Sequence, residues 1–145
     1  MKQQLKVIQL IHIAFCVAVF TFGLISFFIA REEIHFEIPK ALEDLVFPLI
    51  SILGIILGTI LFNKHLSNIN SPENKGTKLI QYQTAFLIKC AFFEAGALAN
   101  IVAFIMAGNA FFMIFAGLSF IFLVMSRPTA SKVVDTLSLQ DTDIL

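Results

Sequence analysis

The amino-acid sequence predicts an all-α membrane protein with four transmembrane helices in a compact antiparallel bundle. The first observation is composition: of 145 residues, 58% are hydrophobic and only 14% are charged, against about 25% charged in a typical soluble domain. The second is that the apolar residues form four long blocks, and the third is that small residues recur at helical spacing in two of them. Ten basic and ten acidic residues leave no net charge, so there is no electrostatic reason to expect nucleic acid as a partner.

The four apolar blocks cover residues 7–30, 45–62, 84–107 and 110–126. About 20 helical residues cross a hydrocarbon core of about 30 Å, and the second and fourth blocks are near the short limit of about 17. The first block is longer than the apolar region of a signal peptide, which has about 7–15 residues. Because Phe28 also stands where a cleavage site needs a small residue, we expect a retained helix.

The connections between the blocks differ in length and charge. Residues 31–44 form an acidic loop, residues 63–83 a longer basic one, and Gly108-Asn109 a very short one that predicts a tight helical hairpin. We expect residues 1–145 to be a single domain, with a flexible polar tail over residues 131–145.

Orientation follows from the Lys and Arg residues near the helix ends, since cytoplasmic loops carry an excess of them. One side of the predicted bundle holds seven and the other holds two, Arg31 and Lys40. We therefore expect a bacterial inner-membrane protein with both termini in the cytoplasm. The seven are Lys2, Lys6, Lys64, Lys75, Lys78, Arg127 and Lys132.

Two stripes of small residues predict where helices pack closely, because small side chains let backbones approach in lipid. The second block contains the GxxxG pair Gly54 and Gly58, and the third block has alanines at i+4 spacing. Packing within the chain is the favoured interpretation, and an interface between copies of the chain is the alternative. The packing residues expected on the third block are Ala91, Ala95, Ala99 and Ala103.

Glu94 carries the most information about function. It lies about 15 Å along the third block from Thr84, where an ionised carboxylate costs about 2.5–3.5 kcal/mol. Three roles stay open: a neutral hydrogen-bonded group, a proton or cation carrier, and a polar contact to another subunit. Judged by depth alone, its partners are Ser119, Ser51 and Thr21.

The other polar residues in the blocks have simpler interpretations. Lys89 lies about 140° around the helix from Glu94, so we expect it to extend its ammonium toward the cytoplasmic interface rather than form an ion pair. His12 and Cys16 stand four residues apart, but two ligands are only half a metal site. We therefore expect an interfacial hydrogen bond from His12 and no metal. Cys16 and Cys90 both lie inside apolar blocks, unlike a disulfide framework.

Nearly the whole chain resembles a family of small, uncharacterised four-helix inner-membrane proteins of Bacteroidota. This resemblance implies a fold and a location but no mechanism. It is carried by Leu10-Ile11-His12, Asn63, Tyr82-Gln83-Thr84, Phe93-Glu94-Ala95-Gly96-Ala97-Leu98, Ala107-Gly108-Asn109 and Arg127-Pro128.

The third block alone is similar to the ion-carrying helix of the c subunits (proteolipids) of rotary ATPases. The matching residues are Glu94-Ala95 and Ala97-Leu98, followed by an apolar run. This second resemblance implies that Glu94 carries a proton or cation. The glycine repeat that packs such subunits into a ring is absent, since the first block has only Gly23.

These features predict a small multi-pass membrane protein with a non-enzymatic accessory or structural role. The sequence has no phosphate-binding loop, nucleophile elbow or HExxH motif, so we expect no enzymatic activity and no cofactor. The expected partners are the lipid bilayer and either further copies of the chain or a larger membrane complex. The alternative function is a proton- or cation-coupled carrier, or a rotor-like subunit, that uses Glu94.

Overall fold

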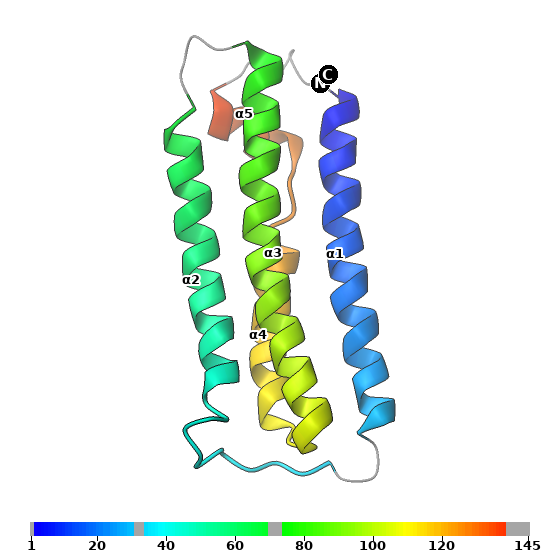
Figure 1. Cartoon of the computed structure of the whole chain (residues 1–145). Helices are drawn as coiled ribbons and strands as arrows, with labels where there is room; N and C mark the ends of the chain where they lie inside the picture. The colour runs from blue at the N-terminus through cyan, green and yellow to red at the C-terminus, as the bar shows by residue number, and fades with distance from the viewer. Residues whose placement is uncertain (1, 31–33, 70–73, 139–145) are drawn as a thin grey trace.

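The structure, a computed structural model, describes residues 2–30, 34–69 and 74–138. In Figure 1 the four longer helices run side by side along a common direction, and α5 lies at the end where α1 begins. The helices that these residues form are α1 (Lys2–Ile29), α2 (Val46–Ser67), α3 (Lys75–Ala107), α4 (Phe111–Met125) and α5 (Ala130–Leu137).

Three helices within the described ranges are each long and apolar enough to cross a membrane: Gln3–Ile29, Val46–Ser67 and Lys75–Ala107. The fourth candidate differs from the continuous span predicted over residues 110–126. α4 has 15 residues, or about 22 Å, and meets the same criterion only together with α5, from which it is bent by 76°. Pro128, in the break between them, has no backbone N–H to continue a helix.

The helices extend beyond the apolar blocks at the end of the molecule that carries α5. α2 continues to Ser67 and α3 already begins at Lys75, so the predicted loop over residues 63–83 is much shorter than expected. Asn74 caps α3, since its side chain accepts a hydrogen bond from the Gly76 N–H at 3.2 Å. Apolar blocks mark the depth of a membrane, whereas caps mark the ends of helices.

α5 occupies part of the segment for which a flexible polar tail was expected. Thr129 caps its start by accepting a hydrogen bond from the Lys132 N–H. Val133, Val134 and Leu137 are buried in the main hydrophobic core, and the polar positions between them are exposed. This apolar side anchors residues 130–137 on the other helices, while residues 139–145 lie outside the described ranges.

α3 is the central helix, which packs against α2, α4 and α1. Gly54 and Gly58 lie in the contact between α2 and α3. A Cβ on Gly54 would lie 2.8 Å from the Phe92 carbonyl oxygen, and one on Gly58 would lie 3.0 Å from the Phe92 Cβ. The two backbones therefore approach as closely as only glycine allows.

The alanine stripe on α3 does not lie on one packed face. Ala91 and Ala95 are exposed, Ala99 is half-buried and Ala103 is buried. Packing within the chain, as expected for the whole stripe, is thus found at Ala103 and not at Ala91 or Ala95. Each i+4 step advances about 400° around a helix, so the stripe shifts by about 40° per step and winds from the outside into the core.

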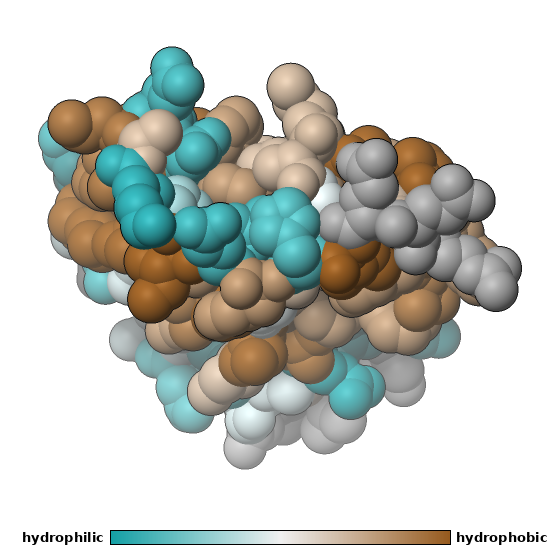
Figure 2. All heavy atoms as spheres, turned by 90° about the horizontal axis from the view of Figure 1, so that it is seen from below, coloured by the Kyte–Doolittle hydropathy of each residue, from teal (hydrophilic) through white to brown (hydrophobic). Residues whose placement is uncertain are grey.

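The opposite end of the molecule is closed by the connection from α1 to α2. Gly108 ends α3 in the left-handed conformation, with φ 64°, and the adjacent Asn109 forms a parallel β-bridge with His35. The His35 N–H donates to the Gly108 carbonyl at 3.0 Å, and the Ala110 N–H donates to the His35 carbonyl at 2.8 Å. Figure 2, which views this end, shows a band of hydrophilic residues bordered by apolar ones.

Candidate functional site

Glu94 lies half-buried on α3, beside α1. Its side chain lines a shallow, open groove of about 290 Å³ together with Ile11, Ala14 and Phe15 of α1. It forms no hydrogen bond or ion pair with any residue in the described part of the chain. The carboxylate therefore borders the outer surface of the helices rather than their core.

None of the three partners expected for Glu94 lines its groove. Thr21 is exposed on α1, six residues or about 9 Å beyond Phe15. Ser51 and Ser119 are fully buried, and both approach Gly96 instead. These partners were expected because they lie at the same depth as Glu94 along their helices. Depth does not specify which side of a helix a residue faces.

The buried polar centre of the molecule is formed by Ser51 and Asn100, which join α2 to α3. The Asn100 Nδ2 donates to the Ser51 Oγ at 2.8 Å and to the Phe47 carbonyl at 2.8 Å. The Ser51 hydroxyl in turn donates to the Gly96 carbonyl at 2.9 Å. Sequence analysis missed the importance of Asn100, although an amide inside an apolar block is itself a signal of a polar helix contact.

Two buried atoms in this centre have no hydrogen-bond partner among the residues that the structure describes, the Asn100 Oδ1 and the Ser119 Oγ. A Cβ on Gly96 would lie 2.9 Å from the Ser119 Oγ and 3.0 Å from the Ser51 Cα. Gly96 thus allows α2, α3 and α4 to meet at one point. The centre holds no ionisable group, which suits it to fixing helix positions rather than moving protons.

His12 is buried and connects α1 to α4. Its Nε2 lies 2.8 Å from the Leu123 carbonyl oxygen, so this nitrogen carries the proton and donates it. The Cys16 Sγ is 3.8 Å from the same nitrogen, and both Cys16 and Cys90 are free thiols. No three potential ligands of the His, Cys, Asp or Glu type come together within the described ranges.

Lys89 faces away from Glu94, into a cavity of about 460 Å³ that lies beneath α5. Its Nζ is 4.8 Å from the centroid of the Phe62 ring and 5.6 Å from that of Phe93. Lys132 and Asp135, both on α5, line the same cavity. Lys89 and Glu94 therefore lie on different sides of α3, as expected. The Lys89 ammonium contacts two aromatic rings in the cavity.

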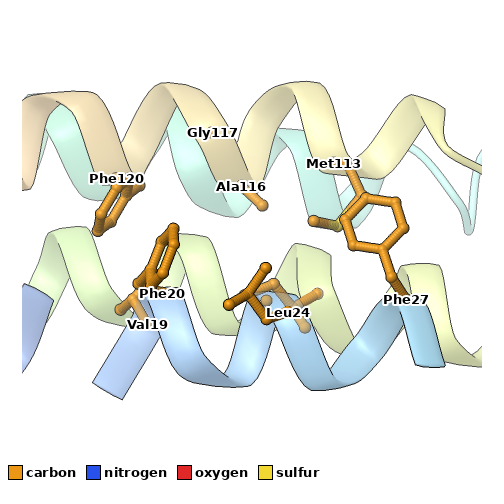
Figure 3. A pocket seen from close by; sticks show the side chains of 10 residues that line it. Val19, Phe20, Leu24, Phe27, Met113, Ala116, Gly117 and Phe120 are labelled. Carbon is orange, nitrogen blue, oxygen red and sulfur yellow. The ribbon is translucent and has the colours of Figure 1, made fainter. Parts of the chain in front are cut away.

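A second groove, of about 180 Å³, separates α1 from α4 and is lined by apolar residues and glycine. Figure 3 shows Phe20 of α1 and Phe120 of α4 facing each other across it, with ring centroids 6.2 Å apart. Leu24 and Ala116 lie farther along the same groove. Such a lining offers nothing to orient a polar substrate.

Three features thus compete as functional sites: the Glu94 groove, the Ser51–Asn100 centre and the cavity beneath α5. The first has a carboxylate without a partner among the described residues, the second has buried hydrogen bonds between helices, and the third has two ammonium groups. No family model matches the chain, and no curated protein or solved structure is significantly similar to it.

Proposed function

We propose that the chain is a non-enzymatic accessory or structural subunit of the bacterial inner membrane, with four helices in an antiparallel transmembrane bundle. Three helices with the length and apolarity of membrane spans support this. So does the large number of exposed apolar side chains along them, including Phe20, Ile56 and Val102. In water these surfaces would drive aggregation, whereas in a bilayer they face acyl chains.

The observation that carries the proposal is the position of Glu94. Ala91 and Ala95 are exposed and lie within about 100° of Glu94 around α3. Glu94 has no partner in the described part of its own chain; a membrane carboxylate in this position is normally satisfied by another helix, and small residues beside it let that helix approach. We therefore propose that the surface formed by Glu94, Ala91 and Ala95 contacts another membrane subunit.

Site-specific photo-crosslinking tests this contact in intact membranes. A benzophenone-bearing amino acid in place of Ala91 should yield a protein adduct of defined mass, and the Glu94→Ala change should weaken it. The same probe at Ile114, exposed on α4, should yield lipid adducts only. An adduct of twice the 16.1 kDa chain mass would identify a second copy, and any other mass a different subunit. Lipid adducts alone at both positions would contradict the proposal.

A proton or cation carrier is the second candidate, favoured by the same carboxylate, which lines an open groove and has no partner among the described residues. Proteoliposomes under an imposed proton gradient separate the two functions. The accessory role predicts equal proton uptake by the unmodified chain and by Glu94→Gln. Uptake that is lost in Glu94→Gln but partly kept in Glu94→Asp, which can still ionise, would establish the carrier.

A further inference from the structure

The cavity beneath α5 brings together two positive charges and one negative charge. Lys89 enters it from α3, Lys132 enters it from α5, and Asp135 is the acidic residue in its lining. Neither lysine forms an ion pair with a residue in the part of the chain that the structure describes. The cavity therefore has an excess positive charge that an anion would neutralise.

Lys89 is held inside this cavity rather than extended into solvent. Its ammonium lies over the Phe62 and Phe93 rings, and such cation–π contacts stabilise a charge that is partly removed from water. The lysine is half-buried, so its side chain has a restricted set of conformations. An anion that enters the cavity would meet an ammonium group already in position.

The depth of Lys89 matches the boundary between hydrocarbon and headgroups. Ala107 ends α3 at the other end of the molecule, 18 residues or about 27 Å away, and a hydrocarbon core is about 30 Å thick. Lys132 and Asp135 belong to α5, the helix that follows the end of α4, and also line the cavity. The cavity therefore opens at the level where phospholipid phosphates lie.

The lining of the cavity is amphipathic. Phe122 and Met125 of α4 line it, and their neighbours Ile121 and Val124, which do not line it, are 55% and 45% exposed. An apolar path thus continues from the cavity onto the lipid-facing side of α4. A free phosphate would use only the polar part of this lining, whereas a lipid would use both parts.

From these features we infer that the cavity beneath α5 binds the headgroup phosphate of an anionic phospholipid, with the acyl chains along Phe122 and Met125. Basic pockets between helices on the cytoplasmic side are suited to such headgroups. The inference rests on the membrane location proposed above. It does not depend on the Glu94 contact, because no residue of α1 lines the cavity.

Lipid binding by the delipidated full-length chain in a neutral detergent tests the inference. Native mass spectrometry would compare phosphatidylglycerol with phosphatidylcholine of identical acyl chains, and a separate arm would add inorganic phosphate. We expect preferential binding of phosphatidylglycerol. Equal binding of the two lipids, or binding of inorganic phosphate with the same affinity as phosphatidylglycerol, would overturn the inference.

Variants on α5 make the test specific, because Lys132 and Asp135 are exposed and their replacement should leave the fold intact. Lys132→Gln should weaken phosphatidylglycerol binding about fivefold, the typical effect of one basic residue near an anionic headgroup. Asp135→Asn should strengthen it, and Lys89→Gln should weaken it. Lys64→Gln removes an exposed lysine of α2 outside the cavity and should change nothing. Equal effects of Lys132→Gln and Lys64→Gln would overturn the inference.

Discussion

Asn109 and Glu37, which are 72 residues apart, are joined by a reciprocal pair of hydrogen bonds. The Asn109 Nδ2 donates to the Glu37 carbonyl at 2.6 Å, and the Glu37 N–H donates to the Asn109 Oδ1 at 3.1 Å. The same Oδ1 accepts a hydrogen bond from the Phe111 N–H at 3.0 Å. One amide side chain therefore holds the connection between α1 and α2 against the turn between α3 and α4.

Asn109→Ala should destabilise the chain by about 1–3 kcal/mol, because it removes three partly buried hydrogen bonds to the backbone of Glu37 and Phe111. Unfolding in detergent, followed by the loss of helical circular dichroism, measures the effect. Asn63→Ala, at an exposed position of α2, is the matched control and should leave stability unchanged. Equal stability of the two variants would show that Asn109 does not hold this end together.

Gly54→Ala should destabilise the contact between α2 and α3. The added Cβ would lie 2.8 Å from the Phe92 carbonyl oxygen, and overpacking of this kind costs about 1–3 kcal/mol. Gly117→Ala is the control, because a Cβ there meets nothing within 4 Å. It should be neutral or stabilise α4 by about 0.5–1 kcal/mol, since alanine favours helix more than glycine. Thermal unfolding of both variants in one detergent measures the two changes in stability. A larger loss of stability from Gly117→Ala than from Gly54→Ala would contradict the prediction.

Ser51→Ala and Ser119→Ala should differ although both serines are fully buried. Ser51 accepts a hydrogen bond from Asn100 and donates one to Gly96, so its loss should cost about 1–3 kcal/mol. The Ser119 hydroxyl has no hydrogen-bond partner within the described ranges, so replacing it should be neutral or stabilising. Chemical denaturation of the two variants measures the difference. A larger loss from Ser119→Ala would mean that its hydroxyl has a partner in the membrane.

Ala103→Leu and Ala91→Leu test the two ends of the alanine stripe. Ala103 is 3% exposed, so the larger side chain should overpack the core and lower stability by about 1–3 kcal/mol. Ala91 is exposed, so the same change should leave the isolated chain stable and disturb only the proposed subunit contact. Thermal unfolding and photo-crosslinking separate these effects. Destabilisation of the purified chain by Ala91→Leu would show that this face packs within the chain.

Cysteine labelling tests the predicted orientation. In a chain whose native cysteines are replaced by alanine, Glu37→Cys should react with a membrane-impermeant thiol reagent in spheroplasts. Asn68→Cys should react only after permeabilisation. Both positions are exposed and lie in or beside connections at opposite ends of the helices. The reverse pattern would invert the orientation.

The sequence allows the apolar helices to be predicted because apolarity is a local property of the chain. The helix termini beyond the blocks depend on caps such as Asn74 and Thr129, which an apolar count ignores. α5 was missed for a related reason: its buried side consists of only Val133, Val134 and Leu137, too few to stand out from a polar tail.

The candidate site was harder to predict because it depends on which sides of the helices face each other. Glu94 is conspicuous in the sequence, but the rotation of α3 that turns it toward Phe15 cannot be read from depth. Pairs such as Asn100 with Ser51, or Asn109 with Glu37, join residues far apart in sequence. No short sequence motif marks such a pair, so the pairs are found only once the packing of the helices is known.

The packing of α1 also has a consequence for biosynthesis. α1 packs on α3 and α4, yet 45 residues separate Ile29 from Lys75, where α3 begins. If the chain is inserted into the membrane as proposed above, then at about 5–20 residues per second the first helix waits on the order of seconds in the bilayer before α3 leaves the ribosome. Only 17% of its apolar window is buried by the rest of the chain. A helix that buries so little can be inserted alone in the proposed topology, and it docks later, once α3 and α4 have both been made.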